Sequence, residues 1–132
     1  MTRRLLALLF ALLAGLAQAQ GFDHNHAAWN ALLGKHVRWL PDNKQSRVDY
    51  AGFARDRAEL RKVLDAMSAV PRAEFDGWQR GERMAFLINA YNAFTLLAIV
   101  EAYPIKGALF SLAPSNSIRQ IDGVWTALRW RA

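Results

Sequence analysis

Cysteine is absent from the 132 residues of the chain, and charged residues make up only 21 % of it. The lack of thiols excludes disulfides, cysteine-ligated zinc, iron–sulfur clusters and cysteine nucleophiles. A glycine-rich phosphate loop, a G-x-S-x-G elbow and an H-E-x-x-H zinc motif are missing as well. The chain is 53 % hydrophobic and includes five tryptophans, a composition typical of a globular protein with one domain at most.

The N-terminus has the three parts of a secretory signal peptide. Arg3 and Arg4 precede an uncharged apolar run over 5–16, and Ala-Gln-Ala follows at 17–19. A basic start, an apolar middle and a small-x-small end predict cleavage after residue 19. The run is short for a hydrocarbon core, which needs about 20 residues, so an uncleaved anchor helix is the less favoured alternative. We therefore expect residues 1–19 to be a signal peptide that is removed on export.

We expect the remaining residues, 20–132, to form a single, incomplete domain in the periplasm or outside the cell. They include 15 basic and 11 acidic residues, a balance of +4. The basic residues are scattered along the chain, and an exported protein seldom meets DNA, so nucleic acid is not an expected partner. The charge favours anionic lipids or anionic polymers of the cell envelope.

The spacing of apolar residues predicts a mostly helical α+β fold. Trp29, Leu32 and Leu33, for example, share one face of a helix that Pro41 brings to an end. Two β-leaning segments predict short strand fragments near 47–50 and 118–125. The same patterns predict helices at about 25–39, 51–69, 71–78 and 82–102.

A second long apolar run, over 84–100, contains no charged residue. A helix that is apolar on nearly every side is normally buried, so we expect this helix to be the buried centre of the domain. A membrane span is the rival interpretation, but Asn89, Asn92 and Thr95 would lack hydrogen-bond partners in hydrocarbon. We therefore expect no transmembrane span after signal cleavage.

Glu82, Asn89 and Asn92 form a polar stripe on this helix, because a step of seven residues returns to within about 20° of its starting direction. A buried amide without a partner costs about 1–3 kcal/mol. The favoured interpretation is structural, with the amides binding backbone groups of a loop around Asp49. The functional alternative is a set of donors that line a polar site, as in an oxyanion hole. These four residues are the candidate polar site, and no catalytic residue is assigned.

His24 and His26 lie beside Asp23, and a His-x-His pair can supply two ligands to a divalent metal. A closed metal site needs more ligands, and His36 lies about 80° away around the helix from His26. We therefore expect no metal or cofactor here, but a polar helix start with Asp23 or Asn25 as its N-cap. His36 is expected to be half-buried and hydrogen-bonded.

Several short motifs resemble those of the domain of unknown function 547 family. The most specific is Phe-Leu-Ile-Asn-Ala-Tyr-Asn-Ala at 86–93, because an Asn-x-Tyr-Asn core inside an apolar helix is not a general helix pattern. The supporting motifs are Tyr-Pro-Ile-Lys at 103–106, Phe-Asp-His-x-His-Ala-Ala-Trp at 22–29, Val-Asp-Tyr at 48–50 and Ile-Asp-Gly-Val at 121–124.

The resemblance implies an exported protein whose biochemical role is uncharacterised. Family members continue into further strands and a cysteine-containing stretch, whereas this chain departs from the pattern over 125–132. We therefore expect a truncated, N-terminal portion of such a protein, with a naturally shorter variant as the alternative. Our first function hypothesis is a non-catalytic structural or binding module. The second is the N-terminal part of a hydrolase-like enzyme whose site at Asn89 and Asn92 is completed by a missing C-terminal half.

Export is directly testable. Mass spectrometry of the protein from the cell-envelope fraction should find a mature N-terminus at Gln20, because the small residues at 17 and 19 mark the cleavage site. Recovery of a chain that begins at Met1 or Thr2 from the cytosol would contradict this prediction.

Overall fold

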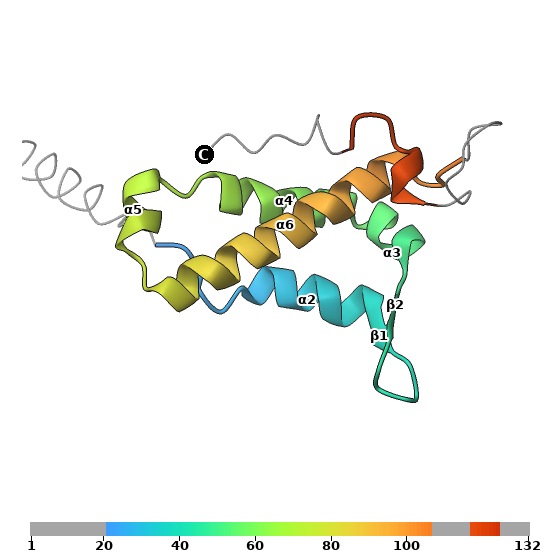
Figure 1. Ribbon diagram of the computed structural model, residues 1–132, viewed down its shortest axis with the longest axis horizontal. Coiled ribbons are helices and arrows are strands. Elements are labelled where there is room, and N and C mark those ends of the chain that lie inside the picture. Colours follow the sequence, from blue (N-terminus) through green and yellow to red (C-terminus); the bar gives the residue numbers. More distant parts are fainter. Residues whose placement is uncertain (1–20, 107–116, 125–132) are drawn as a thin grey trace, which may run out of the picture.

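The computed structural model describes residues 21–106 and 117–124. These residues form a mostly helical α+β fold with one small antiparallel sheet (Figure 1), which confirms the predicted fold class. In chain order the elements are α2 (Ala27–His36), β1 (Val37–Trp39), β2 (Ser46–Val48), α3 (Tyr50–Arg55), α4 (Arg57–Ser68), α5 (Arg72–Gly77), α6 (Arg80–Ala102) and the 3₁₀ helix η1 (Ile118–Gln120).

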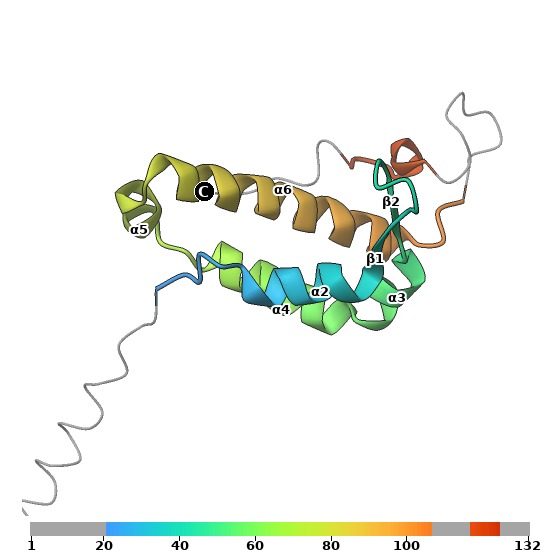
Figure 2. The same cartoon turned by 90° about the horizontal axis from the view of Figure 1, so that it is seen from below.

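The helices form two layers, with the long helix α6 lying over α2, α3 and α4 (Figure 2). The core lies between these layers. Its most deeply buried large side chains are Phe53, Leu60, Phe86 and Val100. On α6 the alanines Ala90 and Ala93 are fully buried, and such small side chains let neighbouring backbones approach closely. The core therefore depends on one face of α6.

The first predicted helix, 25–39, is shorter in the structure. Helix α2 ends at His36, and Val37 adopts the extended backbone that begins β1. Strand β1 pairs antiparallel with β2, Val37 opposite Val48 and Arg38 opposite Arg47. Valine and tryptophan favour strands, and the pairing with β2 overrides the helical spacing. The strand predicted near 47–50 is thereby confirmed as β2, with slightly different bounds.

The second predicted helix, 51–69, is two helices. Helices α3 and α4 meet at Asp56, whose backbone (φ −95°, ψ 23°) interrupts the helical geometry. The Asp56 side chain contacts Lys35 and His36 of α2 at this point. We attribute the break to these long-range contacts, which the local sequence does not record. The helix predicted at 71–78 is confirmed as α5, which begins directly after Pro71.

Helix α6 confirms the helix predicted at 82–102, but the expected burial on nearly every side is wrong. It begins two residues earlier, at Arg80, with a capping box between Gln79 and Glu82. One side is open to solvent, with exposed fractions of 50 % for Met84, 43 % for Leu87, 52 % for Ile88 and 61 % for Tyr91. Within the described ranges, α6 is the one helix long and apolar enough to cross a membrane. Only 22 % of its most apolar 18-residue stretch is buried.

The strand predicted at 118–125 is wrong for the residues that the structure describes. Ile118–Gln120 form η1, whose start is capped by the Ser117 hydroxyl accepting from the Arg119 N–H at 3.2 Å. Val124 N–H then donates to Ile121 at 3.2 Å, continuing the turn. Local backbone bonds replace the partner strand that the pattern requires. Trp125, the predicted signal peptide at 1–19 and the departing tail over 125–132 lie outside the described residues.

Candidate functional site

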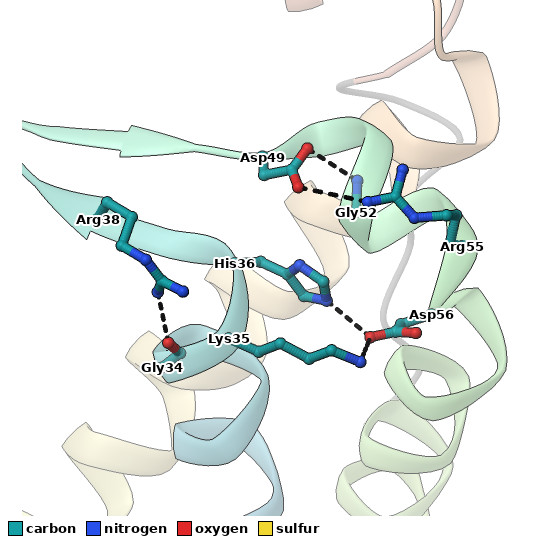
Figure 3. Close-up of polar contacts among 8 residues, drawn as sticks. All are labelled: Gly34, Lys35, His36, Arg38, Asp49, Gly52, Arg55 and Asp56. Atoms are coloured by element: carbon teal, nitrogen blue, oxygen red, sulfur yellow. Dashed lines mark hydrogen bonds and ion pairs between the residues drawn. The ribbon is translucent and has the colours of Figure 1, made fainter.

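The candidate site residue Asp49 lies where the hairpin enters α3 (Figure 3). Its backbone N–H donates to the carbonyl of His36 at 2.8 Å, so the end of β2 is joined to the end of α2. Its carboxylate Oδ1 accepts from the Gly52 N–H at 2.9 Å and caps α3. The other carboxylate oxygen, Oδ2, lies 3.6 Å from the Arg55 guanidinium. Both carboxylate oxygens of Asp49 are therefore occupied by groups of α3.

His36 and Asp56 form a second contact nearby, between the end of α2 and the break between α3 and α4. The Nε2 of His36 lies 2.7 Å from Asp56 Oδ2, which also forms an ion pair with Lys35. These hydrogen bonds, first from Lys35 and then from His36, hold the pKa of the Asp56 carboxyl below its ordinary value. The His36 ring is only 6 % exposed. The prediction that His36 is hydrogen-bonded is confirmed, and its burial is deeper than expected.

Gly52 lies between the two acidic contacts. A Cβ at this position would overlap both Asp49 Oδ2 and His36 Nδ1, so no side chain fits without a shift of these groups. We call Lys35, His36, Asp49, Gly52 and Asp56 the His36 junction. A carboxylate beside an imidazole can orient a general base, but burial of this ring behind Gly52 keeps substrates away from it. What the junction does in this geometry is tie α2 to α3 and α4.

Asp56, Lys35 and Gly52 were not among the candidates from the sequence. His36 and Asp56 are 20 residues apart in the chain. No local sequence pattern indicates which charged residues at such a separation will form a pair. The capping role of Asp49 could have been found, because an aspartate just before a helix is a preferred N-cap.

The structure does not bring the four predicted site residues together. Asn89 Oδ1 accepts from the buried Trp29 indole N–H at 3.3 Å, Asn92 is exposed, and Glu82 caps α6 by accepting from Gln79 at 2.8 Å. The predicted binding of the loop around Asp49 by the two amides is therefore wrong. Asp49 lies near the far end of α6, and the length of that helix separates it from Glu82 by about 30 Å.

Asp23 bonds the backbone at the start of α2, but the N-cap position is His26, so the prediction of Asp23 or Asn25 as the N-cap is wrong. The two carboxylate oxygens of Asp23 accept from the backbone N–H groups of Asn25 and Ala27, each at 2.9 Å. These bonds lower the pKa of Asp23 from its ordinary value. The exposed His24 packs its ring edge-on against Trp78, with centroids 4.5 Å apart. Across residues 21–106 and 117–124, no three His, Asp or Glu side chains are placed to hold a metal ion.

His26 is the unusual residue of this segment. It adopts a left-handed backbone (φ 50°), is 8 % exposed, and has a buried Nδ1 atom without a partner. Burial lowers the pKa of His26 from its ordinary value, against the attraction of Asp23. It lines a cavity of about 400 Å³ together with Phe22, Trp29, Met67, Val70 and Glu74. The sequence pattern placed His26 at a polar surface and did not indicate this burial.

Comparison with known proteins leaves the resemblance to the domain of unknown function 547 family as an expectation. No protein-family model, no curated protein and no solved structure matches this chain.

The two asparagines of α6 should differ in their effect on stability. Asn89→Leu removes the acceptor of the buried Trp29 indole, and we expect the free energy of unfolding to fall by about 1 kcal/mol. Asn92→Leu, at an exposed position, should change it by less than about 0.5 kcal/mol. Urea denaturation of both variants measures the difference. Equal effects would contradict these assignments.

The burial of His26 should make stability depend on pH. The pKa of His26 in the folded protein lies below the ordinary 6.5. The contribution of the neutral, buried ring to the free energy of unfolding is therefore fully present above pH 6.5 and is lost as the pH falls from there through the folded pKa. His26→Phe should therefore weaken the loss of stability between pH 7.5 and pH 5, measured by urea denaturation. The same change at the exposed His24 is the control. A variant that keeps the wild-type pH dependence would show that His26 is not its source.

Proposed function

We propose that the exported chain is a non-catalytic binding module that docks on the anionic lipid surface of the cell envelope. The observation that carries this proposal is the open face of α6. Its exposed apolar side chains are spaced i, i+3, i+4 and i+7, which places them on one side of the helix. We call Met84, Leu87, Ile88 and Tyr91 the α6 strip.

The α6 strip is held open by the packing of the opposite face. Phe86 and Ala90 are 1 % and 0 % exposed and belong to the core, so α6 cannot turn to bury the strip without losing them. A contiguous apolar surface of this kind on a folded protein is a common mark of a protein or membrane contact. The strip is therefore a fixed feature of the fold and is available to a partner.

Charge favours lipid as that partner. The strip lies within a run without charged residues, and the exposed Arg80 lies just before it, with no ion-pair partner among the described residues. The acids at the two ends of α6 are engaged, Glu82 in the capping box and Glu101 in an ion pair with Arg61. An apolar strip with free positive charge beside it matches the acyl boundary and headgroups of an anionic bilayer.

The hydrolase-like alternative places its site at Asn89 and Asn92, but the Asn89 side chain already accepts from the Trp29 indole. The structure adds one further candidate for such chemistry, the His36–Asp56 pair, in which a carboxylate lies beside an imidazole. The imidazole of that pair is closed to a substrate, because the His36 ring is 6 % exposed. The α6 strip is open to its partner without any rearrangement. This difference supports the binding module over the enzyme.

Vesicle binding tests the proposal. The mature protein, purified after export, should sediment with vesicles of phosphatidylglycerol and phosphatidylethanolamine. Replacing Leu87 and Ile88 by Gln in one variant should weaken binding about tenfold or more, because each half-exposed side chain loses about 1 kcal/mol of burial in lipid. Asn92→Gln, on the flank of the same helix, is the matched control and should bind like wild type.

Thermal unfolding separates a lipid contact from an internal one. If the α6 strip faces solvent, the double variant melts at or above the wild-type temperature. A strongly destabilised variant, or a wild-type protein that ignores the vesicles, would overturn the proposal.

A further inference from the structure

The β-hairpin projects from one end of the helical layers (Figure 1) and carries the most exposed of the large hydrophobic side chains. Trp39, the last residue of β1, is 69 % exposed. Its strand neighbour on the same face, Val37, is only partly exposed because it packs against the core. The face of β1 that packs against the core at Val37 therefore continues outside the core, where it presents the exposed indole of Trp39.

The same hairpin carries three basic residues, Arg38, Lys44 and Arg47, against one acidic residue, Asp42. Arg38 and Arg47 are directly opposite each other in the two strands, a like-charge arrangement that destabilises a sheet. Arg38 is turned back, and its guanidinium donates to the Gly34 carbonyl at 2.6 Å (Figure 3). Arg47 and Lys44 have no ion-pair partner among the described residues. Two cations of the hairpin are thus outside the ion pairs formed by the described residues.

The hairpin reaches the level of α6 near the C-terminal end of that helix. Figure 2 shows it rising from the layer of α2 and α3 to this level, and Figure 1 shows it projecting away from α6. The α6 strip lies in the N-terminal half. The strip and the hairpin are therefore two separated surfaces of the molecule.

We infer that the hairpin is a second contact with the anionic lipid surface, in which Trp39 enters the headgroup layer while Arg47 and Lys44 bind lipid phosphates. This inference rests on the proposed function, because it takes the same bilayer as the partner. Tryptophan prefers the interface between hydrocarbon and water, where its ring is buried and its N–H stays hydrated. Basic side chains close to an anionic bilayer each strengthen binding about fivefold.

Vesicle binding of the mature, exported protein tests the hairpin separately from the strip. Arg47→Gln and Lys44→Gln should each lower the partition coefficient about fivefold on vesicles rich in phosphatidylglycerol. Arg57→Gln removes the same charge from the exposed start of α4, outside both the hairpin and the α6 strip, and is the matched control. It should change the partition coefficient less than twofold. On vesicles of phosphatidylcholine all of these variants should match wild type.

Trp39→Phe gives an independent optical readout. Wild-type fluorescence should shift to the blue on binding and be quenched by lipids brominated near the headgroup, and the variant should lose most of both signals. Equal binding by the hairpin variants and Arg57→Gln, with wild type still bound through the α6 strip, would overturn the hairpin contact alone. A wild type that binds no vesicles, but binds a soluble anionic polysaccharide through Arg47 and Lys44, would overturn the lipid assignment for both surfaces.

Discussion

The contact of Asp56 with the end of α2 is the interaction on which the arrangement of the helices depends. Asp56 lies at the break between α3 and α4, and its carboxylate contacts Lys35 and His36. The lowered pKa of Asp56 keeps this carboxylate ionised through the neutral range. The backbone N–H of Asp49 donates to the carbonyl of the same His36. The hairpin, which lies between His36 and Asp49 in the chain, is therefore held at both of its ends. The position of Trp39 outside the core follows from this closure.

Helix α6 meets a constraint of a different kind. It is apolar on nearly all sides, but the layer formed by α2, α3 and α4 covers only one of them. Packing therefore selects the side with Phe86 and the small Ala90 and Ala93, which allow close approach. Leu87 and Ile88 remain outside, although they are as hydrophobic as the residues inside. Their transfer from water is the free energy that the fold leaves for a partner.

The sequence predicted well what depends on local spacing. The fold class, α5 and α6 follow from apolar periodicity and proline position. The failures have non-local causes. The break at Asp56 depends on a partner 20 residues away, and the open side of α6 depends on how many neighbours the helix has. Of the four candidate site residues, Glu82, Asn89 and Asn92 were placed on the correct helix, but a helical stripe does not show which element faces it.

The distribution of charge connects the two surfaces. The acids at the His36 junction and on α6 are engaged by partners within the fold, so their negative potential is largely cancelled where it arises. Among the described residues Arg47, Lys44 and Arg80 have no ion-pair partner; the first two lie on the hairpin with Trp39 and the third lies one turn before the α6 strip. Attraction between such cations and an anionic surface acts within a Debye length of about 8 Å at physiological ionic strength, whereas apolar burial requires contact. In the proposed lipid contact, charge therefore selects the surface and burial holds it.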